Sequence, residues 1–187
     1  PWGLIIFKRN VSAPDQVSEL TQLFRDYVGR PAPVFVDQEG GRVQRLGPPH
    51  WPVYPPGSRY GEIYDRDPAS GIAAARLAGH LIAADLRLVG IDADCLPLGD
   101  VPLASSDPVI GDRAYGSESG KVAAIAKAIA EGLQAGGVLP VLKHLPGHGR
   151  ATADSHHRLP VVDTDRKTLE ETDFAAFRPL ASLPIGM

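Results

Sequence analysis

Short apolar segments of strand length alternate along this chain with segments whose apolar residues recur at helical spacing. The apolar segments lie at residues 3–7, 33–36, 91–101 and 138–142. Apolar strands that alternate with amphipathic helices are typical of a parallel sheet covered by helices. The order of strand and then helix, repeated four times, therefore predicts an α/β fold.

Four helices are expected to follow these strands. Ser12, Asp67 and Ser117 are the expected N-caps of the first three helices, because Ser and Asp side chains accept hydrogen bonds from free backbone N–H groups. Gly90 is the expected C′ residue of the second helix. The fourth helix is expected over residues 166–177, and residues 47–57, rich in Gly and Pro, are expected to form a loop.

The length of the chain limits how much of a barrel it can form. A complete barrel of eight β/α units takes about 250 residues, whereas this chain has 187. About four units in 187 residues indicate a partial barrel or an open sheet. Neither an internal repeat nor a domain boundary is visible, so we expect residues 1–187 to form a single partial domain.

The composition excludes several classes of function. A formal net charge of −3 gives no indication of binding to nucleic acid or to an anionic membrane surface. The single cysteine, Cys95, excludes a disulfide framework, and no apolar run reaches the roughly 20 residues of a membrane span. Because an apolar strand begins almost at once, we expect a trimmed N-terminus, which leaves an export signal open.

Polar and titratable residues are concentrated directly after the last predicted strand, in residues 143–160. Such a concentration at the end of a buried strand is typical of a catalytic site. Asp154 lies two residues before His156, so its carboxylate could bind one ring nitrogen and raise the pKa of the imidazole. The other nitrogen could then exchange a proton with a substrate. The alternative interpretation is a polar loop whose histidines are merely solvated.

Other side chains at predicted strand ends could bind hydroxyl groups of a ligand. These are Asp37, Arg45, Arg113, Lys143 and His144. Asp37 could accept hydrogen bonds from hydroxyl groups, but it could also cap a helix or pair with Arg42. The two arginines could donate into a cleft, although isolated arginines are more often surface residues. Trp51 and Tyr54 could form a stacking wall, or they could pack within their own loop.

The histidines also raise the hypothesis of a metal-dependent hydrolase, because His is a good zinc ligand. Their spacing matches no common zinc motif. We therefore expect no metal ion and no other cofactor. The histidines in question are His144, His148, His156 and His157.

Four motifs occur in a fixed order: VDQEGGRVQR at 36–45, IGDRAYG at 110–116, KHLPGHG at 143–149 and DSH at 154–156. Together they closely resemble the family 3 glycoside hydrolases, specifically their β-N-acetylhexosaminidase branch. The resemblance spans nearly the whole chain, and the DSH motif in this context is the mark of that branch.

The resemblance implies a TIM-like (β/α)8 barrel, incomplete in this chain, with its site at the C-terminal ends of the strands. It implies retaining exo-hydrolysis of terminal β-linked N-acetylglucosamine from a small carbohydrate, which in bacteria usually serves cytoplasmic recycling of cell-wall muropeptides. By position, His156 resembles the general acid/base and Asp154 its partner. The residues that resemble the sugar-binding set are Asp37, Arg45, Arg113, Lys143 and His144. A histidine would thus replace one carboxyl group of the usual two-carboxylate scheme.

The nucleophile of the resembled family is an aspartate on a later strand. After Asp154 this chain offers only Asp163, Asp165 and Asp173, which belong to the segment that leads into the last helix. We therefore expect the nucleophile to lie outside this chain, and the chain alone to be inactive. Two alternatives stay open: a phosphorylase of the same family, which uses phosphate in place of water, and a catalytically inactive sugar-binding fragment.

Overall fold

The computed structural model describes residues 1–155 and 157–186. Four strands form one sheet in the order β1–β2–β5–β6, and every neighbouring pair is parallel. Across the sheet, Ile5 lies opposite Phe35, Phe35 opposite Ala93, and Ala93 opposite Leu139. The predicted order of parallel strands is confirmed, although the regular part of each strand is short. Their bounds are β1 Leu4–Ile6, β2 Val34–Val36, β5 Ala93–Asp94 and β6 Leu139–Pro140.

Isolated bridges continue the sheet beyond the regular strands. Leu98 pairs with Lys143 in parallel, and Val141 pairs with Gly186 on the other side of the same segment. The backbone N–H of Leu142 donates to the Gly186 carbonyl oxygen at 2.8 Å. The end of the described chain therefore lies along the outer edge of β6, and the sheet formed by the described residues is an open one.

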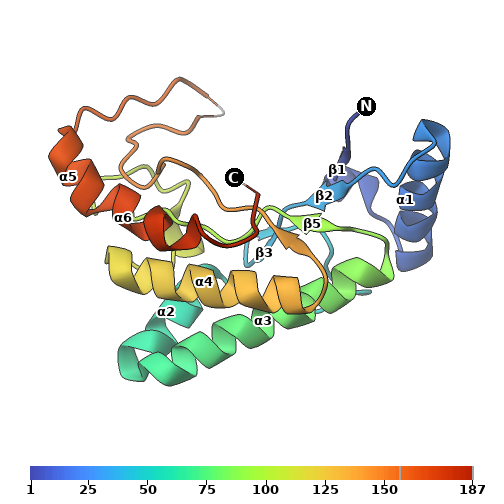
Figure 1. Cartoon of the computed structure of the whole chain (residues 1–187), viewed down its shortest axis with the longest axis horizontal. Coiled ribbons are helices and arrows are strands. Elements are labelled where there is room, and N and C mark those ends of the chain that lie inside the picture. Colours follow the sequence, from blue (N-terminus) through green and yellow to red (C-terminus); the bar gives the residue numbers. More distant parts are fainter. Residues whose placement is uncertain (156, 187) are drawn as a thin grey trace.

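Helices connect successive strands. α1 (Pro14–Val28) joins β1 to β2, α2 (Gly57–Arg66) and α3 (Pro68–Leu88) lie between β2 and β5, and α4 (Ser119–Ala135) joins β5 to β6. Figure 1 shows α3 and α4 together beneath the sheet, while α1 stands apart on the β1 side. The helix α2 was not expected from the sequence. None of the helices in residues 1–155 and 157–186 has the length and hydropathy to cross a membrane.

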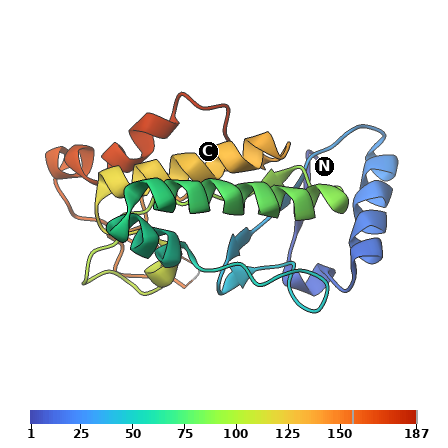
Figure 2. The same cartoon turned by 90° about the horizontal axis from the view of Figure 1, so that it is seen from below.

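The main helix contact is formed by α3 and α4, which lie side by side in both views (Figures 1 and 2). Their backbones approach so closely that a Cβ atom at Gly79 would lie 2.4 Å from the Ile129 carbonyl oxygen. A Cβ at Gly132 would lie 2.1 Å from the carbonyl oxygen of Arg76. The apolar side chains of this layer are almost fully buried: Ala75, Ile82, Leu86, Val122, Ile125, Ile129 and Leu133.

One of the three predicted N-caps is confirmed. The Asp67 side chain accepts from the backbone N–H groups of Ala69 and Ser70 at 3.2 Å each, and Gly90 follows the helix with a φ of 73°. Ser12 is not the cap of α1, because the helix begins one residue after Ala13 and Ser12 instead bonds the Gln16 side chain. The prediction that Ser117 caps the third helix is also wrong, since α4 has Glu118 at its N-cap position.

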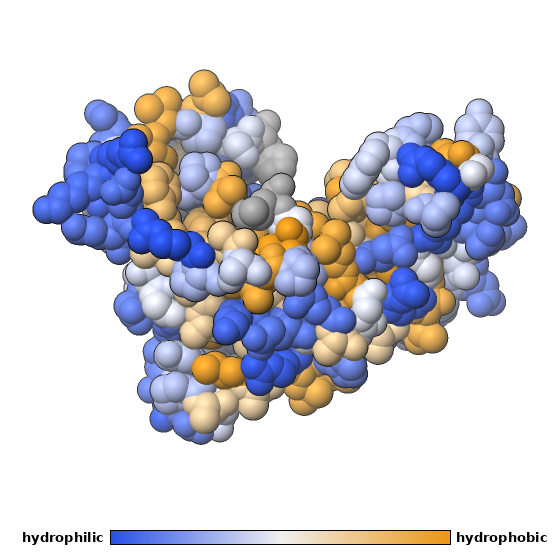
Figure 3. Space-filling view, in the orientation of Figure 1, coloured by the Kyte–Doolittle hydropathy of each residue, from blue (hydrophilic) through white to orange (hydrophobic). Residues whose placement is uncertain are grey.

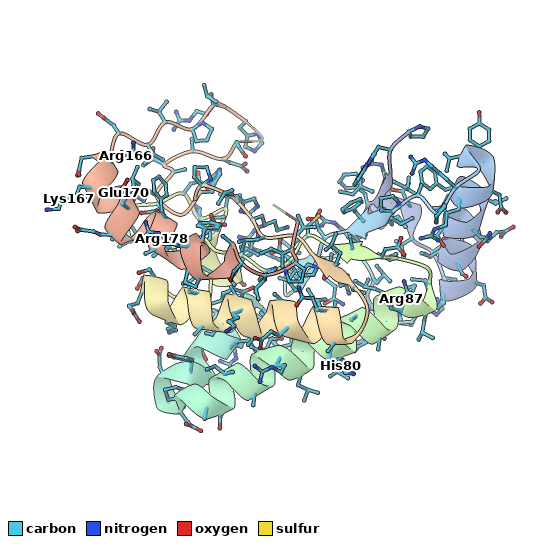
Figure 4. All side chains as sticks on the ribbon, in the orientation of Figure 1. His80, Arg87, Arg166, Lys167, Glu170 and Arg178 are labelled. Carbon is cyan, nitrogen blue, oxygen red and sulfur yellow. The ribbon has the colours of Figure 1, made fainter. Side chains whose placement is uncertain are left out.

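The predicted last helix is divided at Thr172 into α5 (Arg166–Glu171) and α6 (Asp173–Phe177). The Thr172 hydroxyl donates to the Thr168 carbonyl oxygen or to the carboxylate of Asp173, both within 2.7 Å. Asp173 is in turn bound by the Arg150 guanidinium, so the break places a buried ion pair at the start of α6. Figure 4 shows the charged side chains of α5 pointing away from the molecule, as on a solvated surface helix.

Candidate active site

All five hydroxyl-binding candidates gather on one side of the sheet, at the C-terminal ends of its strands. Asp37 directly follows β2, and Lys143 and His144 follow β6. Arg45 follows the short hairpin of β3 (Gln38–Gly40) and β4 (Val43–Gln44), and Arg113 ends a 3₁₀ turn, Gly111–Arg113. Parallel strands end at the same edge of a sheet, so residues far apart in sequence meet there. Figure 3 shows the molecule hollowed between the α5–α6 side and the β1–α1 side.

The buried side chain of Gln38 fixes the hairpin that carries Arg45. Its amide oxygen accepts from the backbone N–H groups of Arg45 and Leu46, both at 3.0 Å, and its amide nitrogen donates to the Leu46 carbonyl oxygen at 2.8 Å. The backbone N–H of Gln38 donates to Asp94 at 2.9 Å. Gly40 turns the hairpin with a φ of 95°, where a Cβ would lie 2.3 Å from the Pro55 carbonyl oxygen. The hairpin therefore brings Arg45 back onto Asp37.

Asp37 is bound by two cations. Arg45 donates to one carboxylate oxygen at 3.0 Å and Lys143 to the other at 2.8 Å. Burial alone would raise the pKa of Asp37, but Lys143 and Arg45 outweigh it and hold the pKa below its ordinary value. Pairing of Asp37 with Arg42 is excluded, since Arg42 binds Asp112 at 3.0 Å.

Glu39, to which the sequence analysis gave no role, lies at the centre of the cluster. Its side chain is 4% exposed, and Lys143 lies 2.6 Å from one of its oxygens. Arg113 binds it through both Nε and a terminal nitrogen, each at 2.8 Å. Burial opposes the charge on both cations, yet Glu39 raises the pKa of Lys143 and of Arg113 above their ordinary values. Lys143 and Arg113 are therefore cluster residues and not surface charges.

A second carboxylate that the sequence analysis did not name, Asp100, binds His144. Its side chain is fully buried, and one oxygen lies 2.6 Å from Nδ1 of His144. The Nε2 atom of the same ring lies 3.5 Å from a terminal nitrogen of Arg113. Asp100 follows β5, and the Gly99 N–H donates to the Lys143 carbonyl oxygen at 2.6 Å, which places Asp100 opposite His144.

The predicted dyad of Asp154 and His156 stays a prediction, because His156 lies outside the described residues. The carbonyl oxygen of Asp154 accepts from the backbone N–H groups of His157 and Arg158, both at 3.1 Å, so a turn begins at Asp154. Its carboxylate lies 3.9 Å from Nε2 of His157. Two later carboxylates have structural contacts: Asp165 caps α5, and Asp173 binds Arg150.

Two further kinds of ligand site were considered, an aromatic stacking wall and a metal site. Trp51 and Tyr54 are each 7% exposed, so both pack mainly in the core, and Trp51 also lines the cleft beside Arg45. Within residues 1–155 and 157–186, no three His, Cys, Asp or Glu side chains are grouped to hold a metal ion. A cleft of about 240 Å³ adjoins the cluster at Arg45, with Lys8 and His50 also on its walls and no carboxylate among its lining residues.

Fold and site together define a class of protein: a TIM-like α/β barrel protein with a charged cluster at the C-terminal ends of its strands. The chain forms an incomplete TIM-like α/β barrel, and its described charged cluster combines three cations, three carboxylates and a histidine at the C-terminal strand ends. The described members are Asp37, Glu39, Arg45, Asp100, Arg113, Lys143 and His144.

The family follows from comparison with known proteins. Residues 2–186 match the model of the glycosyl hydrolase family 3 N terminal domain, so the chain belongs to this family. It is 40% identical over 176 residues to a beta-hexosaminidase of Nitrosomonas eutropha, a match that covers 94% of this chain and 50% of that protein. The chain therefore spans about half the length of the curated relatives it matches.

Solved structures give the same result and confirm the fold class. NagZ from Neisseria gonorrhoeae, in complex with N-trifluoroacetyl-D-glucosamine, superimposes with a TM-score of 0.92 at 33% identity, over 98% of this chain and 54% of that one. A family 3 β-N-acetylglucosaminidase from a Paenibacillus species gives a TM-score of 0.86 at 35% identity, over 94% of this chain and 33% of that one.

Proposed function

We propose that the full-length protein is a retaining exo-glycosidase that releases terminal β-linked N-acetylglucosamine. The observation that carries the proposal is the convergence of Asp37, Arg45, Arg113, Lys143 and His144 on one cluster, in a chain of glycosyl hydrolase family 3. These side chains offer fixed donors and acceptors for the hydroxyl groups of one sugar. The names of the relatives, beta-hexosaminidase and β-N-acetylglucosaminidase, support the choice of sugar.

In this proposal Asp37 accepts hydrogen bonds from sugar hydroxyl groups while Lys143 and Arg113 donate to others. The ion pairs hold all three side chains in place before the sugar arrives, which reduces the ordering needed on binding. The cleft beside Arg45 gives space to the part of the substrate beyond the terminal sugar. We favour muropeptide fragments of the bacterial cell wall, degraded in the cytoplasm, as the substrate.

The acid/base step is assigned to His156, with Asp154 as its partner. His156 protonates the leaving oxygen and then takes a proton from the attacking water, and an aspartate nucleophile carries the sugar in between. A histidine needs little tuning for this task because its ordinary pKa is close to neutral pH.

The test measures release of p-nitrophenol from its N-acetyl-β-glucosaminide by the full-length protein, with the β-glucoside as the comparison substrate. His156→Ala is expected to lower kcat on the order of 10²- to 10⁴-fold, the usual contribution of a general acid/base. His80→Ala is the matched control, since His80 is an exposed histidine on α3, and it should leave kcat unchanged. Full activity of His156→Ala would refute the assignment.

Product analysis separates the hydrolase from its rivals. Proton NMR of the fresh reaction should show the β-anomer of N-acetylglucosamine first, because a retaining enzyme preserves the configuration. N-Acetylglucosamine 1-phosphate formed in phosphate buffer would indicate a phosphorylase instead. Binding of the sugar without any turnover would indicate an inactive sugar-binding protein, and loss of activity on chelation would indicate a metal-dependent hydrolase.

A further inference from the structure

We propose that Asp100 is a positioning residue that holds the His144 ring with its proton on Nδ1, so that Nε2 presents a hydrogen-bond acceptor to the ligand. Asp100 does not touch the ligand in this proposal and acts only through His144. The proposal rests on the proposed function only where turnover is measured, because the state of the His144 ring can be observed without substrate.

The carboxylate of Asp100 is held in one orientation by its hydrogen bonds. Asp100 is fully buried, and both of its oxygens accept hydrogen bonds. One oxygen lies 2.6 Å from Nδ1 of His144 and 3.3 Å from its backbone nitrogen. The other accepts from the backbone N–H of His148 at 2.6 Å. Contacts on both sides leave the carboxylate no freedom to rotate, so the direction of its bond to the ring is fixed.

The two neighbours of the His144 ring determine which of its nitrogens carries the proton. An ionised carboxylate accepts hydrogen bonds only, so Nδ1 of His144 carries the hydrogen in the bond to Asp100. Nε2 faces a terminal nitrogen of Arg113 at 3.5 Å, and a guanidinium group donates only. The 3.5 Å contact is long for a hydrogen bond, so a ligand hydroxyl can replace Arg113 and donate to the lone pair of Nε2. Both neighbours favour the same tautomer.

The tautomer of His144 decides which part of a ligand hydroxyl group the ring can bind. Lys143 and Arg113, the candidate sugar contacts beside His144, are donors, and Asp37 is the acceptor already proposed for sugar hydroxyl groups. A histidine that accepts at Nε2 adds a place for the hydrogen of a hydroxyl group beside those donors. If the ring carried its proton on Nε2 instead, two donors would face each other and a hydroxyl hydrogen would lose its partner.

The same carboxylate also orders the backbone around His144. The Gly147 N–H donates to the His144 carbonyl oxygen at 2.7 Å, and His148 returns to Asp100 one residue later. The rings of His144 and His148 are 5.9 Å apart, edge to face. Removal of the carboxylate could therefore lower stability without any effect on the tautomer, and the experiment has to separate these two roles.

The experiment observes the ring directly by two-bond nitrogen–proton NMR of the full-length protein labelled with ¹⁵N-histidine. The His144 signal is assigned by its loss in His144→Gln. The wild-type ring is expected as the Nδ1–H tautomer. In Asp100→Asn the amide can donate to Nδ1, and the ring is expected to change to the Nε2–H tautomer. A wild-type ring in the Nε2–H form would overturn the proposal even if the variant failed to fold.

Turnover provides the second readout. Loss of a hydrogen bond in a charged site lowers binding on the order of 10- to 100-fold, so Asp100→Asn should raise KM by that factor and leave the pH profile of kcat, set by other groups, in place. Asp92→Asn is the matched control, because it removes a carboxylate at the opposite end of β5, where Asp92 binds Arg25 and Arg87. Lower stability with an unchanged tautomer and KM would overturn the proposal. Absence of hydrolysis by the wild type would refute the proposed function alone.

Discussion

Replacement of Lys143 by methionine is the sharpest test of the charged cluster. Lys143 lies between two carboxylates, 2.8 Å from Asp37 and 2.6 Å from Glu39. The three side chains are 14%, 18% and 4% exposed, respectively. Methionine keeps most of the length of the lysine side chain and removes the charge. The effect on stability is therefore mainly electrostatic.

The magnitude follows from the contacts that survive. Removal of one partner from a buried ion pair lowers stability by roughly 3–5 kcal/mol, because a buried charge is left uncompensated. In Lys143→Met, Asp37 keeps its bond to Arg45 and Glu39 keeps its two bonds to Arg113. We therefore expect the lower end of the range, a loss of about 3 kcal/mol in the free energy of unfolding at neutral pH.

The loss should depend on pH in a defined direction. The pKa of Asp37 is held below its ordinary value, so this carboxylate contributes stability that is fully present above its unfolded pKa of about 3.9. That contribution is lost as the pH falls through the lower folded pKa. In the variant much of it is already missing at neutral pH. The difference between wild type and Lys143→Met should therefore narrow below about pH 4.

The assay is urea unfolding followed by circular dichroism at about pH 7 and about pH 3.5. Lys127→Met is the matched control, because Lys127 lies 3.8 Å from Glu131 on the exposed face of α4. A surface pair of this spacing contributes about 0.3–0.5 kcal/mol. A loss below about 1 kcal/mol for Lys143→Met at neutral pH, or an equal loss at both pH values, would refute the reasoning.

Three further changes test other parts of the structure by the same unfolding assay. Burial raises the pKa of Asp94 well above its ordinary value, so the free energy of unfolding should fall as the pH rises from about 4. Asp94→Asn should flatten this dependence on pH, and an unchanged dependence would contradict the role of Asp94. Tyr54→Phe removes a 2.7 Å hydrogen bond to Asp85 and should lower stability by about 1.5 kcal/mol, whereas no loss would mean that the bond is replaced by water. Gly79→Ala should destabilise by roughly 1–3 kcal/mol, because its Cβ would lie 2.4 Å from the Ile129 carbonyl oxygen; stabilisation, as in an exposed helix, would show that α3 and α4 can separate.

The order of the fold could be predicted because each buried strand has to be apolar and each covering helix has to be amphipathic. The helix α2 was not predicted, since its first residue, Gly57, ends a stretch rich in Gly and Pro that is typical of a loop. A Cβ at Gly57 would lie 2.1 Å from the Arg113 carbonyl oxygen, and one at Gly61 would lie 1.9 Å from that of Tyr115. These glycines are required by close packing against a segment far along the chain, which a local pattern does not reveal.

The candidate site could be predicted in part for a similar reason. Polar residues directly after apolar strands converge in a parallel sheet, so Asp37, Lys143 and His144 were identifiable one by one. Glu39 and Asp100 gain their roles from partners 74 and 44 residues away, Arg113 and His144. The two-residue spacing of the carboxylates in the DQE segment was the one local signal for Glu39.

The cluster also shows how binding and stability are linked in this protein. Many active sites crowd like charges or strained groups, so that removal of a site residue raises stability. Here each cation lies against a carboxylate, and Lys143 lies against two. The contacts that orient donors toward a ligand are thus the same contacts that join the ends of β2 and β6. Substitutions such as Lys143→Met should therefore weaken ligand binding and folding together, and a variant that loses one without the other would mean that the ion pairs do not preorganise the site.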